Sequence, residues 1–288
     1  MGDRFGSDQI LGRVDEALAV FPGVLGFYAK NLSTGEEVGH RADAVMPTAS
    51  VIKVGIMAEL YRQAEAGEVD LGRRLTVQAS DHYGGTGVLK EFEPGVQPTL
   101  TDLCRMMIVV SDNVATGMLV RLLGKDRINR SFDDWGLSQT ELVWNIKLGD
   151  DIRQYAVSTP RDLGRLMELI ATDGFLTPAS TAAMRYHLSR QQHLEQIPRY
   201  LPYDQYATEI GREQPVSVMN KIGNYMGMRA DAAIVAAPGI TFVVAAMNEG
   251  SPDSHFRVDH EGNVLNGRVG RAVFDAWVPP GAVPAEWY

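Results

Sequence analysis

Apolar and polar positions repeat along the chain with two different periods, which separates predicted helices from predicted strands. Apolar side chains at helical spacing fill residues 8–20, and the run Phe21-Pro22-Gly23 ends that helix. Shorter apolar stretches lie on either side of the turn Ser33-Thr34-Gly35. The first half of the chain is therefore predicted to form a helix over 8–20, strands over 24–30 and 37–41, a helix over 50–66 and two short apolar helices between 99 and 123.

The pattern of apolar and polar residues changes twice in the second half of the chain. Residues 138–158 lack clear periodicity and are predicted to form a long surface excursion, a kind of loop that is often functional. A helix is predicted to follow, because Thr159 is a favoured cap residue and Pro160 suits the first turn. Beyond residue 216 the pattern predicts strands over 216–221, 230–237 and 241–247, a hairpin turn at Pro238-Gly239 and a final helix over 267–277.

Strands at both ends of the chain and helices in its middle indicate an α+β fold. We expect the terminal strands to join one five-stranded antiparallel sheet that is flanked by helices, as in an α/β/α sandwich. In this interpretation residues 1–45 and 212–288 form a sheet lobe, and residues 46–211 form an all-helical lobe of the same catalytic domain. A crevice between two such lobes is the natural place for a site.

Composition narrows the classes of function. The chain has 288 residues, of which 45% are hydrophobic and 22% charged, as is typical of a folded globular protein. Its net charge of −9 opposes binding to nucleic acid. The six histidines lack close-spaced partners, so we predict no metal site, and we expect no cofactor. The expected partner is a small-molecule substrate that bears a carboxylate, bound by a monomer.

The hydropathy profile bears on location. The first residues lack the basic segment and apolar segment of a signal peptide, and no apolar run reaches the roughly 18 residues of a membrane span. The sequence as written favours a cytoplasmic location. A secreted or periplasmic location is expected instead if a leader was removed. Cys104 is the single cysteine, so no intrachain disulfide can form.

The first candidate for chemistry is the string Ser50-Val51-Ile52-Lys53. Residues three apart on a helix lie on one face, so Lys53 could act as base to a nucleophilic Ser50 at the helix start. The free backbone N–H groups there favour developing negative charge. A Ser-x-x-Lys string is expected about once by chance in a chain of this length, so this motif alone decides little.

Two further strings have structural alternatives of their own. Ser111-Asp112-Asn113 falls between two predicted helices, where these residue types commonly cap a helix. In a functional interpretation Ser111 relays a proton and the amide of Asn113 orients a substrate carbonyl. Lys221-Ile222-Gly223 ends a predicted strand, and its lysine could simply be a solvated edge residue.

The order and spacing of the three strings favour the functional interpretation. Ser50 and Ser111 are 61 residues apart, and Ser111 and Lys221 are 110 apart. In this arrangement the chain resembles the class A β-lactamases and related penicillin-recognising serine enzymes, from about residue 15 to residue 277. The resemblance implies the β-lactamase/transpeptidase-like fold.

The resemblance also implies a role for each matching residue. Ser50 would be the nucleophile that is acylated, Lys53 its base or proton shuttle, and Ser111 the relay to the leaving nitrogen. Lys221 would supply positive potential. The implied substrate-binding residues are Asn113, Gly223, Asn224 with its backbone N–H in the oxyanion hole, Arg229 as counter-charge to a substrate carboxylate, and Tyr83 at the aromatic mouth of the cleft.

The departures from the family pattern matter as much as the matches. Ile222 stands where the third motif usually has Thr or Ser, which removes a hydroxyl that binds a carboxylate. Many lactamases link two helices by a disulfide, and Met57 takes the place of the partner to Cys104. In the long excursion the deacylating Glu aligns with Asn145, and an amide cannot accept a proton from water near neutral pH.

The carboxylates near Asn145 leave the deacylation step open. Asp150 and Asp151 follow in the same loop, either as solvated loop charges or as a replacement base. Three functions are consistent with the sequence. One is a lactamase-like serine hydrolase of lactam, amide or ester bonds with weakened deacylation. The others are an acyltransferase, peptidase or esterase that passes the acyl group to a non-water acceptor, and a non-catalytic lactam-binding domain.

Overall fold

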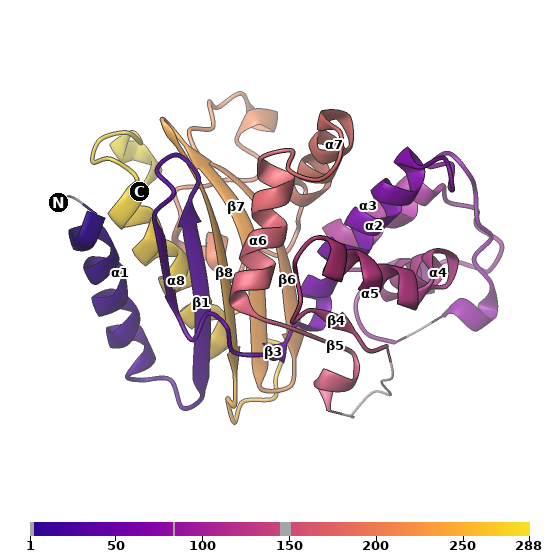
Figure 1. Ribbon diagram of the computed structural model, residues 1–288, viewed down its shortest axis with the longest axis horizontal. Helices are drawn as coiled ribbons and strands as arrows, with labels where there is room; N and C mark the ends of the chain where they lie inside the picture. The colour runs from indigo at the N-terminus through magenta and orange to yellow at the C-terminus, as the bar shows by residue number, and fades with distance from the viewer. Residues whose placement is uncertain (1–2, 83, 145–150) are drawn as a thin grey trace.

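A five-stranded antiparallel sheet organises the computed structural model, which describes residues 3–82, 84–144 and 151–288. The strands lie in the order β2-β1-β8-β7-β6 (Figure 1). The α+β fold and the single sheet built from both ends of the chain are therefore confirmed. The strand bounds are β1 Val24–Asn31, β2 Glu37–His40, β6 Ser217–Tyr225, β7 Met228–Ala237 and β8 Ile240–Glu249.

The register of the sheet joins the two ends of the chain directly. Every residue of β1 pairs with β8, from Val24 opposite Glu249 to Asn31 opposite Phe242. On the other side of β8, β7 pairs in turn with β6, which is an edge strand. Because side chains alternate along a strand, Lys221 and Gly223 of β6 lie on one face of the sheet, and Ile222 and Asn224 lie on the other.

Helices cover both faces of the sheet (Figure 1). Helix α1 Asp3–Leu18 and helix α8 Glu261–Trp277 pack together, and a buried cluster that includes Ile10, Phe27, Phe242 and Phe274 fills the space beneath them. Helix α6 Pro160–Ala171 lies across the opposite face, against β1, β7 and β8. Thr159 caps α6 with Pro160 in its first turn, as predicted.

The remaining helices pack around α2 at the edge of the sheet. They are α2 Lys53–Glu65, α3 Leu100–Val109, α4 Asn113–Leu123, α5 Lys125–Asp134 and α7 Pro178–Ser189. The division into lobes of residues 1–45 with 212–288 and residues 46–211 stays a prediction. Within the second range, α6 rests on the sheet itself.

Two features differ from the predicted elements. Ser50 lies in a short 3₁₀ helix, Ala49–Ile52, and α2 begins only at Lys53. The long excursion contains part of a second, three-stranded sheet in the order β3-β5-β4. Its strands are too short to leave an alternating pattern in the sequence: β3 Met46–Pro47, β4 Glu141–Leu142 and β5 Ala156–Ser158.

A buried carboxylate fixes α5 against α2. Glu59 is fully buried and accepts hydrogen bonds from Arg62 at 2.7 and 2.9 Å, from Gln63 at 2.6 Å and from Ser131 of α5 at 2.6 Å. These partners satisfy both oxygens, as a buried charge requires. The bonds from Arg62 and Gln63 are local to α2, so the contact from Ser131 ties the network to α5.

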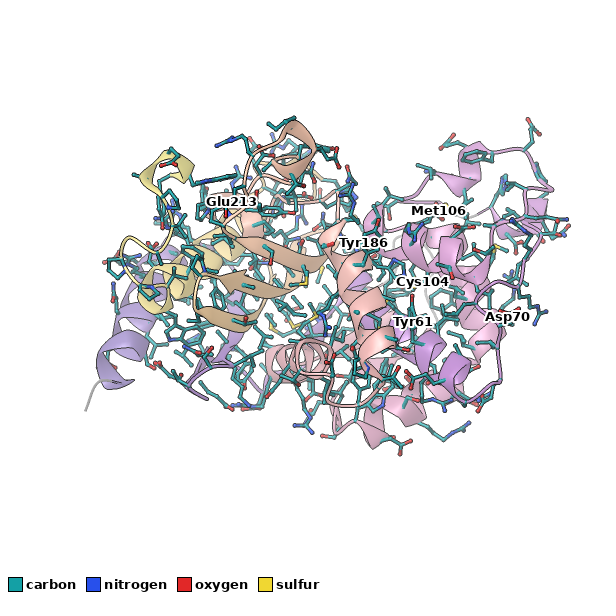
Figure 2. All side chains as sticks on the ribbon, turned by 90° about the horizontal axis from the view of Figure 1, so that it is seen from above. Tyr61, Asp70, Cys104, Met106, Tyr186 and Glu213 are labelled. Atoms are coloured by element: carbon teal, nitrogen blue, oxygen red, sulfur yellow. The ribbon has the colours of Figure 1, made fainter. Side chains whose placement is uncertain are left out.

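The single cysteine belongs to the helical core. Cys104 on α3 is buried as a free thiol, and burial raises its pKa to about 12. Met57 on α2 is also buried in that core. Figure 2 shows Cys104 and Tyr61 in the helical half of the molecule, with Glu213 over the sheet half. Among the residues described, no helix combines the length and apolar composition that crossing a bilayer requires.

The packing of α2 on α5 generates a stability prediction. A Cβ added at Gly55 would lie 2.3 Å from Cε1 of Phe132, so Gly55→Ala should force Phe132 out of place and destabilise the fold by about 1–3 kcal/mol. Gly117, in α4, has no atom within 4 Å of an added Cβ, and Gly117→Ala is the matched control. Urea denaturation measures both variants, and equal midpoints would contradict this packing.

Candidate active site

Ser50 is presented by a strained turn between β3 and α2. The preceding residue, Ala49, has φ of 42°, in the left-handed region that non-glycine residues rarely adopt. Ser50 itself is half-buried, whereas its neighbours Val51 and Ile52 are buried in the core. Buried neighbours hold the turn in place, so the serine is fixed at the surface of the helical core.

Gly223 brings the edge strand β6 into contact with this turn. An added Cβ at Gly223 would lie 2.2 Å from the carbonyl oxygen of Thr48 and 2.9 Å from the backbone nitrogen of Ser50. Only glycine permits so close an approach. The third motif is therefore adjacent to Ser50, and Asn224 follows directly at the strand edge.

Lys53 joins the first motif to the second. Its side chain is 0% exposed, and its Nζ donates hydrogen bonds to the carbonyl oxygen of Ser111 at 2.8 Å, to Ser111 Oγ at 3.1 Å and to Asn113 Oδ1 at 2.9 Å. All three acceptors lie in the Ser111-Asp112-Asn113 string. The structure thus brings together three of the residues that the sequence singled out, over a separation of about 60 positions.

The turn at Ser111 is held in an unusual conformation. Ser111 has φ of 56° and is buried, and its carbonyl also accepts a hydrogen bond from Thr86 Oγ1 at 2.7 Å. Asp112 caps α4 through Ala115 N at 3.0 Å, as the structural alternative for this string required. The Asp112 carboxylate also accepts from the backbone of Val88 and Leu89, so capping and site assembly are two roles of one string.

Lys221 is the second buried lysine. It is 0% exposed, and its Nζ donates to the carbonyl oxygen of Ile222 at 2.8 Å. Burial lowers the pKa of Lys221 to about 7. The carboxylates of Asp231 and Glu195 act in the opposite direction and raise this pKa. Burial, together with the charge of Lys221, lowers the pKa of Lys53 well below its usual range. A lowered pKa makes a lysine easier to deprotonate, and only the neutral amine can act as a general base.

A connecting segment that the sequence analysis did not single out closes one side of the site. We call residues 191–197 the connecting segment. Gln191 Nε2 and Gln192 N donate to the carbonyls of Ile108 and Val109, at the end of α3. Further along, Gln196 Nε2 donates to Asn224 Oδ1 at 2.7 Å, and Ile197 N donates to Asp231 Oδ2 at 2.9 Å. Glutamine and isoleucine are not typical catalytic residues, so the sequence alone does not indicate the role of this segment.

Arg229 is placed on β7, opposite Asn224. Its guanidinium is buried and donates to the carbonyls of Tyr225 and Met228, both at 2.7 Å, and to that of His255 at 2.6 Å. Burial lowers its pKa to about 10. Three of its five N–H groups are engaged in this way, and Nε has no hydrogen-bond partner among the described residues.

The residues expected at the deacylation loop and cleft mouth are described only in part. Tyr83, Asn145 and Asp150 lie outside the described residues. Asp151 is 59% exposed and caps a 3₁₀ helix, Ile152–Gln154, by accepting from Arg153 N at 3.0 Å. Its expected role in deacylation stays a prediction.

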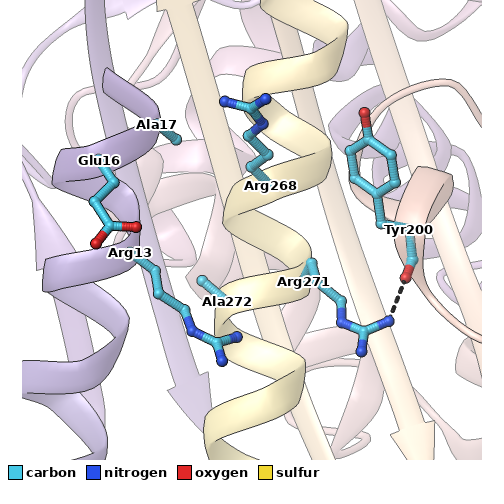
Figure 3. A pocket seen from close by; sticks show the side chains of 7 residues that line it. All are labelled: Arg13, Glu16, Ala17, Tyr200, Arg268, Arg271 and Ala272. Carbon is cyan, nitrogen blue, oxygen red and sulfur yellow. Dashed lines mark hydrogen bonds between the residues drawn. The ribbon is translucent and has the colours of Figure 1, made fainter. Parts of the chain in front are cut away.

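A cavity elsewhere on the molecule is separate from these residues. It has a volume of about 570 Å³ and lies between α1, α8 and the turn at Tyr200 (Figure 3). Its lining includes Arg13, Arg268 and Arg271, and none of the motif residues. Within the described part of the chain, no group of three or more His, Cys, Asp or Glu side chains is arranged to hold a metal ion.

The five-stranded sheet between its helices is the β-lactamase/transpeptidase-like fold. Ser50 directly before α2, Lys53 at its start, the Ser-Asp-Asn turn and the Lys-x-Gly edge strand meet at one side of this sheet. The sequence model of the β-lactamase enzyme family matches residues 11–277. The chain therefore belongs to that family of class A β-lactamase-like serine hydrolases, which confirms the resemblance drawn from its motifs.

Comparisons with individual proteins agree. The chain is 27% identical over 264 residues to a β-lactamase of Streptomyces fradiae, covering 88% of this chain and 81% of that one. It is 29% identical to β-lactamase L2 of Stenotrophomonas maltophilia over 52% of this chain, and this match spans about half (48%) of L2.

Two solved structures share the fold over nearly their whole length. A β-lactamase from Sphaerobacter thermophilus has a TM-score of 0.84 at 28% identity, covering 95% of this chain and 99% of that one. PBP-A has a TM-score of 0.81 at 26% identity, covering 94% and 96%.

The two buried lysines generate a titration prediction. With ¹³C-labelled lysine, NMR should show Lys221 titrating near pH 7 and Lys53 well below its usual range, whereas exposed lysines titrate near 10.4. Lys221→Met removes a positive charge close to Lys53, so the pKa of Lys53 should rise. A Lys53 resonance that titrates with the exposed lysines in the unaltered protein would contradict the lowered pKa.

Proposed function

We propose that the protein forms an acyl-enzyme on Ser50 from a lactam, amide or ester substrate. The observation that supports this proposal best is the placement of Lys53. Its amine is buried, three residues after Ser50, and hydrogen-bonded to Ser111 and Asn113. Burial lowers the pKa of this amine, which favours the neutral form that can accept the proton of a serine.

The proposed acylation follows from these positions. Lys53 accepts the proton of Ser50 Oγ as the oxygen attacks the substrate carbonyl. The backbone N–H groups of Ser50 and Asn224 stabilise the oxyanion, and the close approach at Gly223 brings them onto one site. The carbon–nitrogen bond then breaks. Ser111 donates its proton to the leaving nitrogen and regains one from Lys53, so the proton taken from Ser50 ends on the leaving group.

The fate of the acyl group depends on the loop around Asn145. Water attacks an acyl-enzyme efficiently only when a base accepts its proton, and the aligned residue is an amide. We therefore infer fast acylation and slow hydrolysis. Transfer to a non-water acceptor is the second candidate function, because the residue aligned with the deacylating Glu offers water no base. The structure of a single-residue variant of PBP-A is an acyl-enzyme complex with penicillin G, and its likeness to this chain has 26% identity and a TM-score of 0.79.

The nucleophile can be tested directly. Incubation with penicillin G or a fluorophosphonate should add one label per chain, and intact-protein and peptide mass spectrometry should locate it on Ser50. Ser50→Ala should abolish the label, because the proposed mechanism has no other nucleophile. Ser33→Ala, at an exposed turn, is the control and should label fully. Labelling that persists in the Ser50→Ala variant would show that Ser50 is not the nucleophile.

The deacylation step can be tested by replacing one amide with a carboxylate. With penicillin G the wild-type protein should release one equivalent of product in a burst and then turn over slowly. Absence of a general base costs about 10²–10⁴-fold in the assisted step. Asn145→Glu should raise the steady rate, and Asn145→Gln, which matches glutamate in size but lacks its charge, should not.

Two other outcomes of this experiment would point to a different deacylation base or to a different function. Rapid wild-type turnover without a burst would show that another group supplies the base, and Asp150→Asn and Asp151→Asn would then identify it. An adduct that neither water nor an added amine releases would identify a lactam-binding domain in place of an enzyme.

A further inference from the structure

We propose that this site takes substrates whose group beside Ile222 is an uncharged amide or an amine, not a carboxylate, and that Glu195 sets this preference. The inference rests on the proposed function, because it concerns the same acylated serine. It goes further by naming the substrate class and the residue that selects it.

The first observation is the loss of donors from the third motif. Ile222 is buried and offers only an aliphatic side chain, so the strand lacks the hydroxyl that could hydrogen-bond a carboxylate at this position. Its cross-strand partner is Asp231, a buried carboxyl that accepts hydrogen bonds from Ile197 N and Asn220 Nδ2. Ile222 therefore offers a carboxylate no hydrogen bond, and a buried acid lies opposite it on β7.

The second observation is that Arg229 is already engaged. Its two terminal nitrogens donate to three backbone carbonyls, and the side chain is buried. Its Nε has no hydrogen-bond partner among the described residues, but that atom is buried as well. Because the side chain is 0% exposed, a ligand carboxylate could reach the remaining N–H groups of Arg229 only if neighbouring residues moved aside.

The third observation is an acid at the same end of the site. Glu195 belongs to the connecting segment, and the residues that follow it, Gln196 and Ile197, hydrogen-bond Asn224 and Asp231. Glu195 is therefore fixed beside β6 and β7. Its charge is close enough to raise the pKa of both Lys221 and Arg229. The positive potential of those two groups is thus opposed at the place where an anionic substrate would need it.

The fourth observation is that Glu195 has room for a donor. Its side chain is 15% exposed, so it is held in the structure but still reachable from solvent. Its Oε1 lies 3.9 Å from His193 Nδ1, which is too long for a hydrogen bond. A carboxylate accepts hydrogen bonds only, so its natural partner is an N–H group. An amide or ammonium on the substrate or on the acyl acceptor supplies one, whereas a carboxylate would be repelled.

The test uses two probes that differ only in this charge, penicillin G and its methyl ester. Intact-protein mass spectrometry over time gives the second-order rate constant for acylation of Ser50 by each. The wild-type protein should react at least about tenfold faster with the ester than with the acid. Glu195→Gln keeps the size of the side chain and removes its charge, so it should lower this ester-to-acid ratio about tenfold. Ile222→Thr should also lower the ratio, by restoring a hydroxyl.

A control separates the local effect from net charge. Glu213→Gln makes the same change of charge at an exposed position outside the connecting segment and should leave the ratio unchanged. Because Ile222→Thr changes a different residue, it keeps the test valid if Glu195→Gln fails to fold.

The outcomes distinguish this inference from the proposed function on which it rests. Faster reaction with the acid in the wild-type protein, or a ratio unaltered by Glu195→Gln and Ile222→Thr, would overturn the preference while leaving acylation of Ser50 intact. No adduct on Ser50 with either probe would overturn the proposed function, and this inference with it.

Discussion

Two buried lysine side chains, Lys53 and Lys221, impose the constraint on which the rest of the site depends. Neither ammonium group is exposed, and the charge of Lys221 disfavours the charged form of Lys53. Moving two like charges out of water is unfavourable unless acceptors surround them or one gives up its proton. The surrounding structure supplies those acceptors: the carbonyl and hydroxyl of Ser111 and the amide of Asn113 for one lysine, and the carbonyl of Ile222 for the other.

The acceptors themselves depend on strained or crowded backbone. Ser111 can present both its carbonyl and its hydroxyl to Lys53 because the chain turns there with φ of 56°. Asp112 holds the turn from one side, and the connecting segment holds the end of α3 from the other. Residues with no chemical role of their own thus determine where the reactive groups stand. The site is a property of the junction between the sheet and the helices, not of one element.

The sequence was most informative where a motif combines an unusual residue with a regular pattern. The strands of the C-terminal half were predictable from their apolar runs. The order and spacing of three motifs pointed to Ser50, Ser111 and Lys221, whose catalytic roles stay predictions. Helices α5 and α7 were not predicted as separate elements, because each has few large apolar residues and is held by tertiary contacts, such as that between Ser131 and Glu59. The connecting segment was unpredictable for another reason: its glutamines act through the register of β6 and the end of α3, which only the folded chain shows.

The pairing of β1 with β8 has a consequence for synthesis of the protein. β1 ends at Asn31, and β8, its partner along its whole length, begins only at Ile240. At the roughly 5–20 residues per second of a ribosome, β1 therefore waits on the order of tens of seconds for the strand that will cover it. During that time β2 is available on its other side, and the edge that later pairs with β8 stays open. The sheet, and with it β6 and Gly223, can close only after β8 is made, so the edge of β1 that faces β8 stays unpaired until then.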